Sequence, residues 1–170
     1  MKMTDLFLAD LEMEAKLSRL VLERVPEGRP DWKPHEKSMP MGYLSALVAR
    51  MHAWVGMTIT TDELDLKPAD GSTSAYTPRP LGTTRELLQL LDESVAEGRE
   101  ALAKTTDEHL LTPWKLLVGG HVVVNQARHL VLRNGLSHLA HHRGQLTVYL
   151  RLSGASVPAV YGPSADEGRF

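Results

Sequence analysis

The longest helical pattern of the chain contains the stretch Asn134-Gly135-Leu136-Ser137-His138-Leu139-Ala140-His141-His142-Arg143-Gly144-Gln145-Leu146. From about Gln126 to Leu152, apolar residues recur at the spacings of one helix face, with polar residues between them. Gly154 comes two residues later, and glycine is common just beyond a helix C-terminus. The pattern therefore predicts one long amphipathic helix over residues 126–152.

Three more helices are predicted before this segment, over residues 4–25, 40–59 and 83–105. The third begins with Thr83-Thr84-Arg85-Glu86, which has the Thr-x-x-Glu spacing of a capping box. Residues 60–82 and 112–124 predict loops, the second with room for two short extended pieces. Together, the four predicted helices and the loops between them indicate an all-α fold, an antiparallel four-helix bundle, in a single domain of residues 1–170.

The composition limits the metal chemistry that the chain can perform. Its 170 residues include no cysteine and eight histidines. The absence of cysteine excludes disulfide scaffolds, cysteine nucleophiles, thiolate zinc sites and iron–sulfur clusters. Histidine, aspartate and glutamate remain as metal ligands, so a metal site in this chain must be built around histidine.

The charge balance bears on partners and location. The 19 basic and 21 acidic residues give a formal charge of −2, and no basic cluster suggests a nucleic-acid partner. The N-terminal apolar residues are interrupted by Asp10, Glu12 and Glu14, and no run of about 18 apolar residues occurs. We therefore expect a cytoplasmic protein that engages neither nucleic acid nor membrane.

His138 and His142 are the candidate metal pair. A step of four residues in a helix brings the second side chain almost above the first, so two imidazoles can address one ion. Asn134 and Gln145 would extend this stripe into an unusually polar face for the interior of a bundle. Chance pairing of two histidines at this spacing is the alternative. His141 projects about 100° away from His142 and is assigned to a neighbouring face.

The remaining histidines and the methionines are assigned structural roles. His129 is expected to be half-exposed near the start of the last helix, while His35, His109 and His121 fall in predicted loops. Methionines of the second predicted helix are expected to line or fill the core, because a copper site would need further soft ligands.

Several segments resemble the DinB family of bacterial helical-bundle proteins. The central motif is His-x3-His-Arg-Gly-Gln over residues 138–145. The tail Tyr161-Gly162-Pro163-Ser164-Ala165-Asp166-Glu167 and the segment Trp32-Lys33-Pro34-His35-Glu36-Lys37-Ser38-Met39 are also similar, so the resemblance extends over the whole chain. It implies the DinB/YfiT-like bundle, a homodimer, and a zinc or nickel ion held by three histidines, two of them at His138 and His142.

The third ligand implied by the resemblance is missing. Its position, five residues beyond Gly42 in the second predicted helix, is Leu47, and a histidine follows only at His52. Five residues turn a straight helix by about 140° net and advance it about 7.5 Å, so His52 should face away from the Leu47 direction. A helix irregularity such as a π-bulge would be needed for His52 to be a ligand; otherwise it is a surface or interface histidine.

Two functions of different class follow. The first is an enzyme, a metal-dependent thiol transferase or hydrolase acting on a small molecule, in which an open metal position activates what binds there. In it, Gln145 or Asn134 would orient a ligand, and Arg143 or Arg133 would meet a substrate carboxylate. Carboxylates near Asp62, Glu63 and Asp65 are candidates to complete the metal shell. The second is a non-catalytic member with an incomplete metal site, whose bundle binds a small ligand or a protein.

Overall fold

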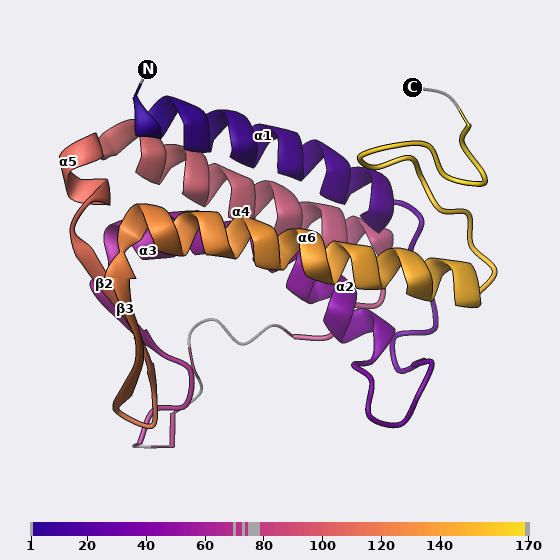
Figure 1. The fold of residues 1–170 in the computed structure, drawn as a ribbon. Coiled ribbons are helices and arrows are strands. Elements are labelled where there is room, and N and C mark those ends of the chain that lie inside the picture. Colours follow the sequence, from indigo (N-terminus) through magenta and orange to yellow (C-terminus); the bar gives the residue numbers. More distant parts are fainter. Residues whose placement is uncertain (1, 70, 73, 75–78, 169–170) are drawn as a thin grey trace.

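The computed structural model describes residues 2–69, 71–72, 74 and 79–168. Three long helices run beside one another: α1 (Met3–Leu22), α4 (Thr84–Lys104) and α6 (Arg128–Leu152). Two shorter ones, α2 (Met41–Arg50) and α3 (Ala53–Thr60), pack against both α4 and α6, which each also contact α1 (Figure 1). No helix in the described part of the chain is long and apolar enough to cross a bilayer.

The capping box predicted for the third helix is confirmed at the start of α4. The Thr83 hydroxyl accepts from the Glu86 backbone N–H, and the Glu86 carboxylate accepts from the Thr83 backbone N–H at 3.1 Å. Two amide groups that lack partners in a helical first turn are thereby satisfied. From this start, α4 presents Leu87, Leu91 and Leu102 to the core.

The helix predicted over residues 40–59 is broken at Met51 and His52, where α2 ends and α3 begins. The Trp54 amide donates to the Met51 carbonyl at 3.1 Å, so the bond spans three residues where an α-helix spans four. Beyond the break, α3 packs closely on α4: a Cβ at Gly56 would lie 3.0 Å from the Glu97 carbonyl oxygen. The break has no local signal such as proline, and the helices on both sides of it contact α4.

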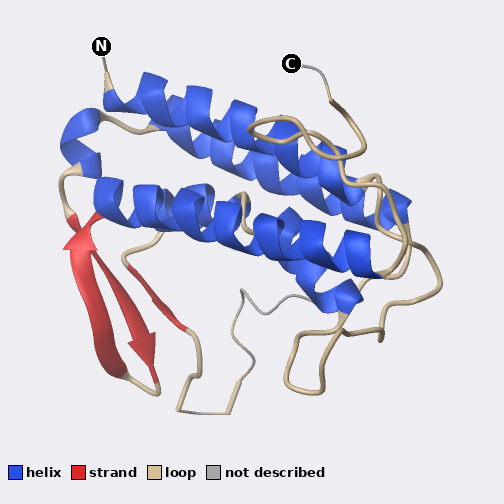
Figure 2. Ribbon diagram, turned by 45° about the vertical axis from the view of Figure 1, so that its right-hand side comes forward, coloured by secondary structure: helices blue, strands red, loops and turns tan. Residues whose placement is uncertain are grey.

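The predicted all-α fold is confirmed only in part: the protein is mostly helical, but it also has a small three-stranded sheet. β2 (Pro113–Val118) and β3 (His121–Ala127) form an antiparallel hairpin, and β1 (Glu63–Asp65) pairs with β2 in parallel. Figure 2 shows the sheet at one end of the helices. The two extended pieces allowed for residues 112–124 are therefore strands. The loop predicted over 60–82 contains β1, and its residues 70, 73 and 75–78 lie outside the described part.

The hairpin turn explains why a loop-like sequence folds as a sheet. Gly119 and Gly120 both have positive φ, 61° and 78°, a combination that fits the tight two-residue turns of β-hairpins. The Asp65 carboxylate accepts from both of their backbone N–H groups, at 3.1 and 2.7 Å. β1 is therefore held to the hairpin by a side chain as well as by the strand ladder.

Arg128 fastens the sheet to the helices. Its guanidinium, 2% exposed at the start of α6, donates to Thr112 Oγ1, the Pro113 and Thr61 carbonyls, and Asp62 Oδ1 at 2.6 to 2.9 Å. These groups flank β1 and β2, so one buried cation fixes where the sheet begins relative to α6. The fold thereby places one end of the sheet over the helices that carry the candidate site.

Candidate functional site

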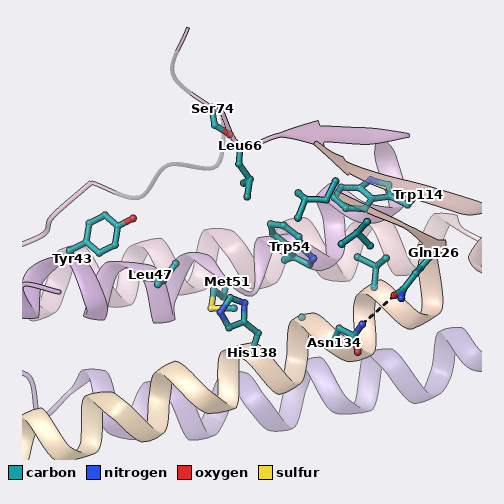
Figure 3. A pocket seen from close by; sticks show the side chains of 14 residues that line it. Tyr43, Leu47, Met51, Trp54, Leu66, Ser74, Trp114, Gln126, Asn134 and His138 are labelled. Carbon is teal, nitrogen blue, oxygen red and sulfur yellow. Dashed lines mark hydrogen bonds between the residues drawn. The ribbon is translucent and has the colours of Figure 1, made fainter. Parts of the chain in front are cut away.

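A pocket of about 430 Å³ lies between α6, the sheet and the consecutive helices α2 and α3, which together are called the α2–α3 arm. Figure 3 shows side chains from these three sources directed toward a common space. The α2–α3 arm contributes Tyr43, Leu47, Met51 and Trp54, and the facing residues of α6 include Asn134 and His138. Its volume suits a small organic molecule, since ligand sites commonly measure about 300–1,000 Å³.

Two tryptophans form the aromatic end of the pocket. Trp54 and Trp114 meet edge to face, with ring centroids 5.8 Å apart and planes 65° from parallel. Trp114 is 1% exposed, and its indole N–H donates to Thr61 Oγ1 at 3.3 Å. Trp54 sits against α6 where Gly135 leaves room, because a Cβ there would lie 2.8 Å from Trp54 Cδ1. Sequence reasoning assigned neither indole to a site; an aromatic in α3 facing a glycine in α6 is visible only once the helices are packed.

The described polar groups that line the pocket carry no fixed charge. Asn134 of α6 donates to Gln126 Oε1 of β3 at 3.4 Å, and this bond joins the helix to the sheet across the pocket wall (Figure 3). His138 lies farther along α6 and lines the same space. Among the described residues that line the pocket, none is an aspartate, glutamate, lysine or arginine.

The structure brings His138 and His142 together as the helical spacing predicts. Their ring centroids are 4.5 Å apart, and that of His141 is 5.2 Å from His142. The Gln145 Oε1 atom can only accept, so His142 Nδ1, at 2.9 Å, donates to it. His142 Nε2 therefore carries the lone pair. The Gln145 amide nitrogen in turn lies 3.0 Å from His141 Nε2 and donates to it.

The surroundings of His138 favour its neutral imidazole. Partial burial is the main cause that lowers the pKa of His138, and the nearby rings of His142 and His141 lower it further, because a second positive charge so close is unfavourable. A neutral imidazole is the form that binds a metal or accepts a hydrogen bond.

His52 is not part of this cluster. It is 1% exposed at the junction of α2 and α3, and its Nδ1 donates to the Ala49 carbonyl at 3.2 Å. The charges that act on it are those of Glu14 and Arg143 in the core, and it does not line the pocket. Burial lowers its pKa from 6.5 to about 4. The break in the helix leaves His52 buried and therefore does not make it available as a ligand beside His138.

Leu47 occupies the place in the pocket where the resemblance implies a third ligand. It lines the same pocket as His138. Two of the three loop carboxylates named as replacements are engaged elsewhere: Asp62 pairs with Arg128 at 2.6 Å, and Asp65 holds the hairpin turn. Within the described residues, no group of three or more His, Asp or Glu side chains is arranged to hold a metal ion.

Arg143 does not face the pocket and is not placed to meet a substrate carboxylate. It is 1% exposed and pairs with Glu14 of α1 at 2.5 Å, and it donates to Ser18 Oγ at 3.1 Å. Tyr161 of the C-terminal tail contacts both charged partners, and its hydroxyl donates to Glu14 at 2.9 Å. The arginine and the glutamine of the Arg-Gly-Gln motif therefore have different roles. Arg143 links α6 to α1 and the tail, while Gln145 orients His142. Arg133, the other candidate, is exposed on α6 and does not line the pocket.

The fold and the site define a mostly helical protein with a small sheet and a ligand-sized pocket beside a histidine pair. The model of the DinB family matches residues 79–169, more than half of the chain, and the protein belongs to this family.

Two solved structures share the fold. A DinB-like protein from Bacillus cereus ATCC 10987 superposes with a TM-score of 0.66 at 21% identity, over 91% of this chain and 95% of that one. The DinB-like protein YjoA from Bacillus subtilis gives 0.65 at 16% identity, over 96% and 99%. The uncharacterized protein YrdA of Bacillus subtilis strain 168 is 50% identical over 32 residues, which span 19% of each chain.

Proposed function

We propose that this DinB-family protein binds a small organic molecule in the pocket between α2, α3, α6 and the sheet. One observation carries the proposal: three separate parts of the fold converge on a space of about 430 Å³ that side chains leave unfilled. The pocket opens to solvent, since Gln126, Asn134 and His138 on its wall are exposed, so a ligand can enter it. Apolar walls with a few placed polar groups are the usual composition of a ligand site.

Ligand-observed NMR tests the proposal with three probes that differ in charge: 2-naphthamide, 2-naphthoate and 2-naphthylmethylammonium. Binding of any of them should be abolished by Leu47→Trp, which fills the pocket from α2. Leu6→Trp makes the same change at a site that is 49% exposed on α1 and should leave binding intact. If no probe binds, or if Leu47→Trp binds as well as the parent protein, the pocket is not the site.

A second candidate function is a divalent-cation site at His138 and His142. The observation that favours it is the pair of imidazoles with centroids 4.5 Å apart. In one of them, His142, the hydrogen bond from Nδ1 to Gln145 orients the ring and leaves Nε2 free. Such orientation of a ligating histidine through its other nitrogen is typical of metal sites. Two donors do not complete a three-histidine centre, because Leu47 stands where the resemblance implies the third. The metal-dependent thiol transferase or hydrolase that the resemblance implies rests on this incomplete site.

Metal analysis of the purified protein tests the second candidate. Near-stoichiometric zinc or nickel in the parent, lost in His142→Ala and kept in His121→Ala, would support it. His121 is the control because it is an exposed histidine on β3. A folded parent that carries no metal and does not bind added zinc would overturn it. Leu47→His should raise zinc affinity at least tenfold if residue 47 faces the pair.

A further inference from the structure

Among the described residues, the pocket offers a charged ligand no fixed counter-charge. Two arginines of α6 are engaged outside the pocket, since Arg128 pairs with Asp62 and Arg143 with Glu14. The residues that line the pocket in the described part of the chain include no carboxylate, ammonium or guanidinium group. Asn134, Gln126 and His138 are exposed, so the cost falls on an ion that leaves water for the apolar walls of the pocket. The apolar walls therefore favour an uncharged ligand over a carboxylate, a phosphate or an amine.

The walls favour a flat ring. The indoles of Trp54 and Trp114 meet edge to face at one end, and Tyr43 lies at the other end of the α2–α3 arm (Figure 3). Aromatic pairs gain from offset or edge-to-face contact in addition to the burial of apolar surface. Leu47 and Met51 supply apolar contact between these ends, and the thioether of Met51 adapts to irregular shapes.

The amide pair at the sheet supplies hydrogen bonds of both kinds. Asn134 Nδ2 donates to Gln126 Oε1 at 3.4 Å, a long bond that uses one donor and one acceptor of the pair. Asn134 Oδ1 is left to accept and Gln126 Nε2 to donate, as far as the described residues show. A ligand that presents an N–H donor beside a carbonyl acceptor would match both groups. Such a ligand would be held by two neutral hydrogen bonds.

We infer that the pocket takes an uncharged planar aromatic molecule carrying a group that both donates and accepts hydrogen bonds, such as a primary carboxamide, with its ring against Trp54, which the buried Trp114 supports from behind, and its polar group on Asn134 and Gln126. The inference rests on the proposed small-molecule function and names its ligand class. It assigns specificity to the two amide side chains, whereas the metal hypothesis assigns it to histidines.

Isothermal titration calorimetry with the three naphthalene probes tests the class. 2-Naphthamide should bind at least tenfold more tightly than 2-naphthoate or 2-naphthylmethylammonium at pH 7.5. Gln126→Leu and Asn134→Leu should each weaken the amide about tenfold and leave 2-methylnaphthalene, which has no polar group, within twofold of the parent. Asn125→Leu is the matched control, because Asn125 precedes Gln126 on β3, does not line the pocket and should change nothing.

The outcomes separate the inference from the function on which it rests. Tightest binding by the amide, weakened at residues 126 and 134 but not at 125, supports the class. Equal or tighter binding by the naphthoate or the ammonium probe, still blocked by Leu47→Trp, overturns the class and leaves the pocket function standing. Loss of 2-methylnaphthalene binding in Asn134→Leu would also overturn the assignment, because it would show a collapsed pocket in place of a lost hydrogen bond. No binding by any probe overturns both.

Discussion

The burial of His52 predicts that this residue makes a separate contribution to the loss of stability in acid. Its pKa in the fold is about 4, against 6.5 in an accessible histidine. Between these values the unfolded chain binds a proton that the folded chain refuses, so stability is complete above about pH 6.5 and falls as the pH drops toward 4. The charged groups that act on His52 are Glu14 of α1 and Arg143 of α6.

The size of the effect follows from the two pKa values. Between pH 7 and pH 5, protonation of residue 52 in the unfolded chain lowers the free energy of unfolding by about 2 kcal/mol. Below pH 4, the full difference of about 2.5 pKa units corresponds to about 3 kcal/mol. Urea denaturation of the parent and of His52→Gln at both pH values measures it. Glutamine removes the titration and keeps a donor that can reach the Ala49 carbonyl. The parent should lose about 2 kcal/mol more than the variant, which is about 4–8 °C in Tm.

The control is His121→Gln, which removes an exposed histidine and should follow the parent protein. Acidic residues titrate over the same range, but they do so in all three proteins, so the difference between parent and variant isolates His52. If the parent and His52→Gln lose the same stability between pH 7 and pH 5, or if the His52 ring protonates near pH 6.5 in an NMR titration, the burial argument fails.

Three further predictions concern stability, each measured by urea denaturation at pH 7.5. Arg143→Met leaves the Glu14 carboxylate buried without its partner and should cost about 3–5 kcal/mol, part of which Glu14→Leu in the same chain should restore; a double variant as unstable as the sum of the singles would contradict this. Tyr161→Phe removes the hydroxyl that donates to Glu14 and should cost about 1–3 kcal/mol, and an unchanged midpoint would show that the tail is not held there. Thr83→Ala removes the cap of α4 and should cost about 1 kcal/mol, whereas Thr83→Ser should cost less, and equal losses would argue against the cap.

Local patterns predicted most of the helices. Apolar spacing gave α1, α4 and α6 close to their observed bounds, and the Thr-x-x-Glu signal placed the start of α4. These features depend on residues within a few positions of one another. For β2 and β3, the sequence analysis expected a loop with room for two short extended pieces, although Gly119-Gly120 between two apolar runs is a hairpin signal. β1 was missed because its pairing with β2 joins segments far apart in the chain.

The site was predictable only in the part that one helix contains. His138 and His142 lie together because both belong to α6, and helical periodicity fixes their separation. The pocket required the tertiary structure, since Trp54, Trp114 and Gln126 come from three elements whose approach no local pattern specifies. The same holds for Arg143, whose position beside the histidines suggested a substrate contact, although in the fold it faces Glu14 on another helix.

The sequence by itself determined the helical character, the absence of cysteine chemistry, the histidine pair and the leucine at residue 47. Tertiary structure alone decided that His52 is enclosed in the core, that the motif arginine is structural, and that a small sheet closes one end of an uncharged aromatic pocket. The physical reason is the range of the interactions. Periodicity and capping act within a few residues, whereas burial, ion pairing and cavity shape depend on which faces of distant segments meet.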